Sequence, residues 1–218
     1  MKIGVLGTGM VGNAIGTKLI QLGHEVMMGA RATGNEKATE WTKSNGSKAS
    51  QGTFADAAAF AETFIFNCTS GQGSMEALKM AGEDNLKGKI LVDISNPLDF
   101  SMGMPPSLTI CNTDSLGETI QRSFPDLQVV KTLNTLNAHI MVNPNRVANG
   151  DHNIFLSGND ADAKQKTSAL LQTFGWQAAH IIDLGDISTA RGTEMLLPIW
   201  IRLYGAFGSP EFNFKIVR

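Results

Sequence analysis

The hydrophobic positions of this chain fall into short apolar runs separated by longer amphipathic stretches. Each apolar run has the length of a strand and is rich in valine, isoleucine, leucine, phenylalanine or methionine. These runs lie at 2–6, 25–31, 63–68, 89–94 and 128–131. Helical stretches between them lie at 13–22, 35–44, 53–62, 73–81 and 115–123. The alternation predicts an α/β fold with a doubly wound parallel sheet, which binds ligands beyond the carboxyl ends of its strands.

A second, smaller cycle follows a polar, glycine-containing stretch at 145–151. Its pattern predicts a strand, a helix and a strand, in that order, at 153–157, 160–174 and 177–182. We therefore expect a first domain of residues 1–150 and a small C-terminal α/β extension, residues 151–218, that contributes to a ligand pocket and a subunit interface.

The last long segment contains the stretch Met195–Tyr204, which is apolar almost all round and predicts a buried helix. Pro198 would kink this helix unless it lies in the first turn. Three of its residues are unusual in a protein core and are better candidates for a dimer interface or a second ligand site: Trp200, Arg202 and Tyr204.

The first strand opens directly into Gly-Thr-Gly-Met-Val-Gly at 7–12, and a helix and the second strand follow. A G-x-G-x-x-G motif in this strand–helix–strand context is the fingerprint of a Rossmann dinucleotide-binding fold. Gly7 makes the tight turn, Gly9 lets the backbone approach a pyrophosphate, and Gly12 lets the helix pack close to the strand. We expect the pyrophosphate at the free N–H groups and positive dipole end of the helix.

The end of the second strand indicates which dinucleotide is bound. NAD sites usually place Asp or Glu about 20 residues after the motif, where it holds the ribose 2′-hydroxyl. Here Ala30 and Arg31 take that place, Asn35 and Lys37 follow, and no carboxylate precedes Glu36. Arg31 can stack on the adenine or form a fork onto a 2′-phosphate, and Lys37 can add a point charge. The sequence therefore predicts NADP(H).

Composition and charge mainly exclude classes of partner and site. The net charge of −2 argues against nucleic acid as a partner, because that would require a basic face. No apolar run reaches the length of a membrane span, and the chain passes from Met1-Lys2 straight into a strand, so we expect a cytoplasmic protein without signal peptide or membrane anchor. Cys68 and Cys111 match neither a disulfide framework nor a zinc site, and no metal is expected.

Candidate ligand-binding residues follow three of the predicted strands. They are Cys68, Thr69, Ser70, Ser95, Asn96, Pro97, Asn134, Thr135, Leu136 and Ala138. Because the carboxyl ends of parallel strands meet at one edge, we expect these segments to line one crevice with the glycine turn. Of the four histidines only His139 lies near them, and no acid–base pair stands out, so no catalytic residue is assigned. Hydride transfer between two bound cofactors depends on proximity and orientation more than on such groups.

Five segments in a fixed order carry a resemblance to a known family. They are GTGMVGNAIGTKLIQLGHEV, GAR, VDISNP, KTLNTLNA and DLGDISTARGTEMLLPIWIRLYG. In this order they resemble the NADPH-dependent reductases of the deazaflavin coenzyme F420, over nearly the whole chain. The same region is similar to the cytoplasmic oxidoreductase domain of the six-transmembrane metalloreductases, which reduce a flavin. The glycine motif is shared with many Rossmann enzymes, whereas the order of the other segments is more specific.

The resemblance implies a role for each matching position. The pyrophosphate contacts beside the glycines would be Thr8, Met10 and Val11. The 2′-phosphate contacts would be Arg31 and Lys37, with Ala30 standing where the family commonly has a hydroxyl residue, so one contact is lost. Thr69 and Ser70 would lie along the cofactor. The nicotinamide end would be shaped by Asn96, Pro97 and residues 134–138.

These features predict an NADP(H)-dependent oxidoreductase that passes hydride to a deazaflavin such as F420 or to FMN or FAD. We expect it to act on small molecules as a homodimer, without nucleic-acid or membrane partners. Enzymes of the hydroxyacid or pyrroline-carboxylate type normally add a longer helical C-terminal half, and the residues after Asp151 are too few for one. A non-catalytic NADP-binding redox sensor stays open as an alternative, because no acid–base group is evident.

Overall fold

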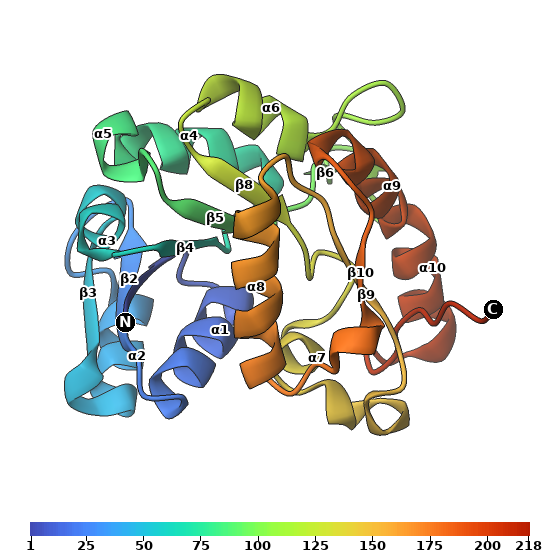
Figure 1. The fold of residues 1–218 in the computed structure, drawn as a ribbon, viewed down its shortest axis with the longest axis horizontal. Helices are drawn as coiled ribbons and strands as arrows, with labels where there is room; N and C mark the ends of the chain where they lie inside the picture. Colours follow the sequence, from blue (N-terminus) through green and yellow to red (C-terminus); the bar gives the residue numbers. More distant parts are fainter.

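A computed structural model describes residues 1–218, and its centre is a six-stranded parallel sheet of order β3-β2-β1-β4-β5-β8 (Figure 1). The strands are β1 (Lys2–Leu6), β2 (Glu25–Ala30), β3 (Ala49–Thr53), β4 (Phe64–Asn67), β5 (Ile90–Asp93) and β8 (Gln128–Lys131). The chain starts in the middle of the sheet, runs outward to β3, and returns to β4 on the other side of β1. The predicted doubly wound sheet is confirmed, with its switch point between β1 and β4.

Helices cover both faces of the sheet. They are α1 (Met10–Gln21), α2 (Glu36–Asn45), α3 (Phe54–Phe60), α4 (Gly71–Ala81), α5 (Glu83–Leu86), α6 (Leu116–Ser123), α7 (Ala138–Val142) and α8 (Ala161–Thr173). On one face α1, α2, α7 and α8 share a cluster of 26 buried residues, and on the other α3, α4, α5 and α6 share a cluster of 18. Neighbouring residues of one strand, such as Ile65 and Phe66, enter opposite clusters. Burial on both faces explains why the strands read as continuous apolar runs.

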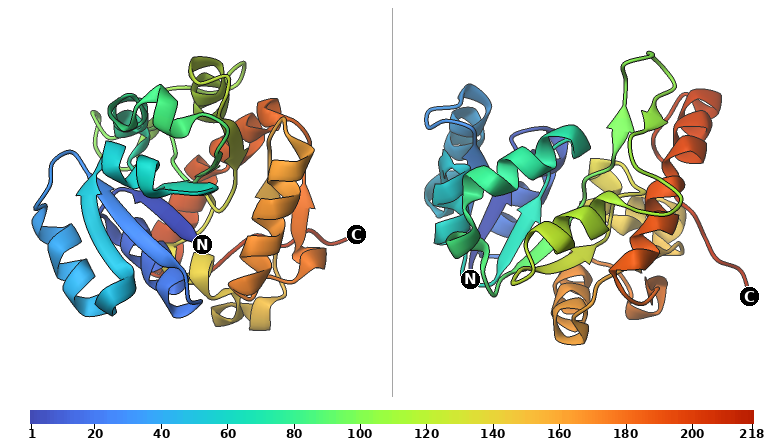
Figure 2. Two further views of the ribbon diagram at one scale, coloured as in Figure 1. Left: turned by 60° about the vertical axis from the view of Figure 1, so that its left-hand side comes forward. Right: turned by 90° about the horizontal axis from the view of Figure 1, so that it is seen from above.

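Strand β3, a hairpin after β5, and the short helices α5 and α7 were not predicted. The edge strand β3 has the sequence ASQGT, which lacks the large apolar residues of the other strands, and it forms by pairing with β2 from Ala49 to Thr53. The helix after it begins as expected, because Thr53 and Asp56 form a capping box. A short hairpin of β6 (Leu98–Asp99) and β7 (Ser107–Leu108) projects from the body in the right-hand view of Figure 2.

The C-terminal part adds a small sheet of its own. Strands β9 (Ile154–Leu156) and β10 (Ile181–Asp183) pair in parallel, and a single antiparallel bridge from Ser157 to Lys131 attaches this sheet to β8. Strand β10 begins later than predicted, because residues 178–180 form a 3₁₀ turn. The 3₁₀ helices are Gly46–Lys48, Pro144–Arg146, Ala148–Gly150, Ala178–His180 and Ile187–Thr189.

The last segment forms two helices, α9 (Ala190–Met195) and α10 (Leu197–Phe207). Pro198 lies in the first turn of α10, where its missing N–H breaks no helical hydrogen bond. Only Leu197 of α10 is buried, and Phe207 is 62% exposed, so the prediction of a helix buried all round is wrong for the single chain. The reason is that only one side is covered, where Trp200 stacks on Phe212 of the C-terminal tail. None of the helices is both long and apolar enough to cross a membrane.

Candidate functional site

The glycine turn forms a backbone cradle between β1 and α1. Gly7 has a φ of 115°, which favours glycine, and a side chain on it would lie 2.8 Å from the Cys68 carbonyl oxygen. A side chain on Gly12 would lie 2.0 Å from the Gly7 carbonyl oxygen, so this glycine permits the close helix–strand packing. At Gly9 nothing lies within 4 Å of the corresponding position. The three glycines therefore have the three separate environments that the motif predicts.

The start of α1 is free to bind an anion. Gly9 is its N-cap residue, no side chain caps the first turn, and that turn carries no acidic residue. The first N–H groups of a helix have no partner inside the helix, and its positive dipole end favours negative charge. The open space at Gly9 and these free donors fit a dinucleotide pyrophosphate.

A cleft of about 610 Å³ opens beside this cradle. Nine of the predicted binding residues line it: Gly7, Thr8, Gly9, Ala30, Arg31, Asn35, Cys68, Thr69 and Ser70. Five further residues, which the set of candidate binding residues does not contain, line it as well: Ala32, Thr33, Gly34, Phe54 and Gly73. Phe54 is the first residue of α3, next to the unpredicted strand β3, so no sequence signal placed it here.

Polar groups in the cleft are partly occupied by local structure. Asn35 caps α2 by accepting a hydrogen bond from the Ala38 N–H at 3.1 Å, and Ser70 caps α4 by accepting one from the Gly73 N–H at 3.3 Å. The Thr69 hydroxyl donates to the Asn67 side-chain oxygen at 2.7 Å. Burial raises the pKa of the Cys68 thiol, and the Asp93 carboxylate raises it further, so this cysteine stays protonated.

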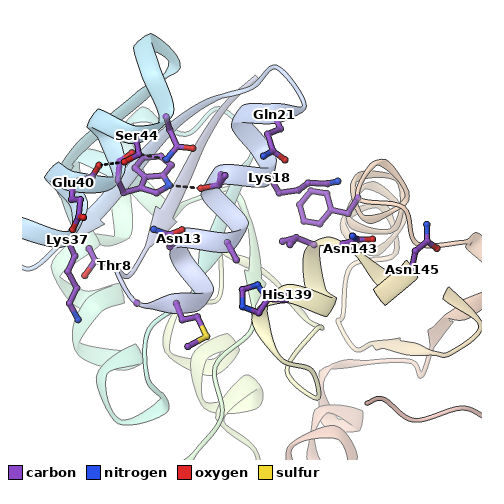
Figure 3. A pocket seen from close by; sticks show the side chains of 18 residues that line it. Thr8, Asn13, Lys18, Gln21, Lys37, Glu40, Ser44, His139, Asn143 and Asn145 are labelled. Atoms are coloured by element: carbon purple, nitrogen blue, oxygen red, sulfur yellow. Dashed lines mark hydrogen bonds between the residues drawn. The ribbon is translucent and has the colours of Figure 1, made fainter. Parts of the chain in front are cut away.

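A second, larger groove of about 1020 Å³ runs along α1 between α2 and α7 (Figure 3). Lys37 lies on this side, next to Thr8, and His139 lies across the groove from it. Arg31 and Lys37 therefore line different cavities, which share only Thr8 and Gly9. Met10 also lines the groove, and Val11 packs against the core below it.

The segments after β5 and β8 meet each other, but residues 95–97 and 134–138 line neither of the two cavities. The Asn96 side chain donates to the Asn134 carbonyl oxygen at 2.8 Å, and the Asn134 side chain donates back to Asn96 Oδ1 at 2.9 Å. A side chain on Gly71 would lie 1.9 Å from the Asn96 carbonyl oxygen, so glycine at this position lets the segment of Ser95, Asn96 and Pro97 pack against the start of α4. Asn96 is half-buried, and the other predicted residues of these segments are buried rather than open to a ligand in the single chain: Ser95, Pro97, Asn134, Thr135, Leu136 and Ala138.

Sequence reasoning missed a cluster of buried charges behind these segments. Lys131 Nζ lies 2.8 Å from Asp93 Oδ2 and 2.8 Å from Glu194 Oε1, and all three side chains are buried. Burial opposes the charge of Lys131, but the two carboxylates outweigh it and raise the lysine pKa. A lysine at the end of an apolar strand could have indicated a buried charge. Nothing in the sequence indicates that Glu194 is its partner.

The fold and the glycine cradle at its switch point define the class of Rossmann dinucleotide-binding proteins. Within that class, residues 2–97 match the family described as NADP oxidoreductase, coenzyme F420-dependent. A crystal structure from Arthrobacter sp. FB24, of a candidate F420-dependent NADP reductase, is 56% identical, with all of both chains covered and a TM-score of 0.95. The chain belongs to this family and is an NADP-dependent oxidoreductase, as its sequence predicted.

Two curated relatives extend the comparison. The F420-dependent NADP reductase of Methanothermobacter marburgensis is 28% identical over 212 residues, which cover 93% of this chain and 92% of that protein. The metalloreductase STEAP3 of Rattus norvegicus is 28% identical over 203 residues, which cover 91% of this chain but 38% of the rat protein. This chain therefore corresponds to well under half of the rat protein. The predicted relationship to both groups is confirmed.

Proposed function

We propose that this protein transfers hydride between NADPH and a deazaflavin coenzyme of the F420 type. The observation that carries the proposal is the glycine cradle at the switch point, beside strand ends that present amides and hydroxyls rather than a proton-transfer pair. Such a site suits a reaction that depends on the alignment of two rings. The names of the Arthrobacter and Methanothermobacter relatives support F420 as the acceptor.

We assign the binding roles by position along the cleft. The N–H groups at the start of α1 would hold the pyrophosphate, with Thr8, Met10 and Val11 beside them. Arg31 would bind the 2′-phosphate. Asn96, Pro97 and Asn134 would orient the nicotinamide end, where NADPH, once bound, supplies the hydride. Burial and Asp93 raise the pKa of the Cys68 thiol, which makes it a poor proton donor.

The deciding experiment is anaerobic turnover of NADPH with F420, FMN, FAD and a ferric chelate in parallel. We expect loss of the visible absorbance of F420 with the wild type, and a much slower loss at limiting NADPH with Gly9→Ala as the control for a site-dependent reaction. Turnover with FMN or FAD but not with F420 would identify a flavin, rather than a deazaflavin, as the acceptor. Tight NADPH binding without turnover of any acceptor would support the non-catalytic redox sensor instead.

We also propose that residues 1–150 hold NADP, and that residues 151–218 complete the acceptor side and form a homodimer interface. Support comes from α10, on which Ile199 is 51% and Phe207 62% exposed. Large exposed apolar side chains on one helix are typical of an interaction surface. Sedimentation analysis of the wild type and of Ile199→Glu/Phe207→Glu tests this, and a monomeric wild type would contradict it.

A further inference from the structure

Lys131, Asp93 and Glu194 form a cluster of charges that no ligand can reach. Their side chains are 0%, 0% and 2% exposed. Lys131 ends β8 and Asp93 ends β5, whereas Glu194 comes from α9 in the C-terminal part. Removing three charges from water is costly, and it is tolerated only when each charge is paired and its hydrogen-bonding groups are satisfied.

Each member of the cluster is fully hydrogen-bonded. Besides the two carboxylates, the Lys131 ammonium group donates to the Ser95 carbonyl oxygen. Asp93 Oδ1 accepts from the Ser95 hydroxyl at 2.7 Å and from the Asn67 side chain at 2.8 Å. Glu194 accepts from the N–H groups of Leu116 and Gly117 at 2.8 and 3.0 Å, at the start of α6. The helix dipole of α6 compensates the excess negative charge of the cluster.

The same cluster fixes both segments at the nicotinamide end of the proposed site. Ser95 is held by Lys131 and Asp93, and the next residue, Asn96, exchanges two hydrogen bonds with Asn134. The Asn134 side chain also donates to the carbonyl oxygen of Thr193, the residue before Glu194, at 3.2 Å. Helix α9 therefore contacts the end of β8 and the segment after it through two consecutive residues, and it reaches the segment after β5 through Lys131.

The segment after β8 needs such support. Leu133 has a φ of 59°, a left-handed conformation that is unfavourable for a leucine and persists only where the surroundings impose it. It lies between Lys131 and Asn134, the two residues of this segment that contact α9.

We propose that Glu194, acting through Lys131, is a positioning residue that holds the segments 95–97 and 132–137 in the conformation that receives the nicotinamide ring. The inference rests on the proposed function, because it presupposes that NADPH binds in this crevice. Glu194 itself touches no ligand, so its effect is confined to the nicotinamide half of the cofactor.

Glu118 offers a matched control. It also links α6 to α9, since Arg191 Nε donates to Glu118 Oε2 at 2.8 Å, but its side chain forms no hydrogen bond or ion pair with β5, β8 or Asn134. Glu118→Gln and Glu194→Gln therefore each replace one carboxylate that links α9 to α6. Only Glu194→Gln disturbs the segments 95–97 and 132–137.

The test compares the dissociation constants of NADPH and of 2′-phospho-ADP-ribose, which lacks the nicotinamide, by calorimetric titration. We expect the wild type to bind NADPH about tenfold tighter, because its nicotinamide end is preorganised. In Glu194→Gln this ratio should fall toward one while the affinity for 2′-phospho-ADP-ribose stays the same. With an active acceptor, the hydride-transfer rate should drop about 100-fold, as a displacement of 1 Å can cause. Glu118→Gln should preserve the ratio and the rate.

If Glu194→Gln does not fold, Lys131→Met/Glu194→Gln replaces it, because this double variant keeps the net charge of the cluster unchanged. An unchanged ratio in the folded variant, an equal loss in Glu118→Gln, or a wild type that binds both compounds equally would overturn the positioning role. A wild type that binds neither compound would contradict the proposed function and this inference together.

Discussion

Arg31, at the end of β2, is paired with Glu76 of α4, with 3.2 Å between the guanidinium nitrogen and the carboxylate oxygen. The sequence shows no carboxylate between the second strand and Glu36, but the fold brings one from 45 residues away. Both side chains are more than half exposed, at 68% and 60%, so the pair is weak and can exchange its partner. Glu76 would thus compete for this guanidinium group with the 2′-phosphate that we propose Arg31 binds.

Replacing Glu76 by glutamine should strengthen NADPH binding by about two- to fivefold, the range of a surface ion pair. NADH, which lacks the 2′-phosphate, should bind as before, and Arg31→Ala should remove most of the preference for NADPH. Calorimetric titration of both nucleotides measures this. Asp126→Asn, which breaks the exposed pair with Lys87, is the control and should change neither affinity. Weaker NADPH binding in Glu76→Gln would mean that Glu76 orients Arg31 rather than competing for it.

The glycines of the turn should differ in what their substitution affects. In Gly9→Ala the added methyl group contacts no atom of the chain, so the variant should keep the thermal midpoint of the wild type. It should lose at least about tenfold in NADPH affinity, because the methyl group enters the proposed pyrophosphate site. Gly12→Ala would place a methyl group 2.0 Å from the Gly7 carbonyl oxygen and should lower stability and affinity together. Thermal unfolding and titration of the two variants separate these effects. A folded Gly9→Ala variant with native affinity would refute the pyrophosphate assignment.

Stability should fall in acid partly because of Glu118. Hydrogen bonds from Arg191 and Ser115 hold the pKa of this carboxyl below its ordinary value. In the unfolded chain the pKa of Glu118 is about 4.3, and above that pH its ionised form contributes fully to the stability of the folded state. This contribution is lost as the pH falls through the lower pKa that Glu118 has in the folded protein. Glu118→Gln should flatten the decline of the thermal midpoint below about pH 4.3. The same change at the exposed Glu83 serves as the control, and equal curves for wild type and Glu118→Gln would exclude this contribution.

The two cysteines should react very differently with iodoacetamide. Cys111 is exposed, whereas burial and Asp93 raise the pKa of the Cys68 thiol, and only a thiolate attacks the reagent. Mass spectrometry of the native protein at mildly alkaline pH should find Cys111 alkylated and Cys68 intact. Unfolding in denaturant should make both react. Alkylation of native Cys68 at the rate of Cys111 would show that the strand end opens in solution.

The sequence predicted those features of the fold that are determined by residues close together in the chain. The apolar strands and the glycine turn predicted the sheet and its switch point, because periodicity and turn chemistry are read within a few residues. Strand β3 was missed since its pairing with β2, rather than its own polar composition, makes it a strand. Asn96 and Asn134 were each assigned to the crevice, and they do meet. Their support by Glu194 could not be predicted, because a buried ion pair between residues 131 and 194 depends on tertiary contacts that have no local pattern.

The origin of Glu194 in α9 has a consequence for engineering and evolution of this fold. A chimera that joins residues 1–150 to a foreign C-terminal segment would keep Lys131 and Asp93 but lose the carboxylate that accepts from Leu116 and Gly117. Two buried backbone donors and one ammonium proton would then lack a partner, and each such group costs about 1–3 kcal/mol. Residues 1–150 are thus not a transferable module, and a recombined chain keeps the cluster intact only if the exchanged segment carries an equivalent glutamate.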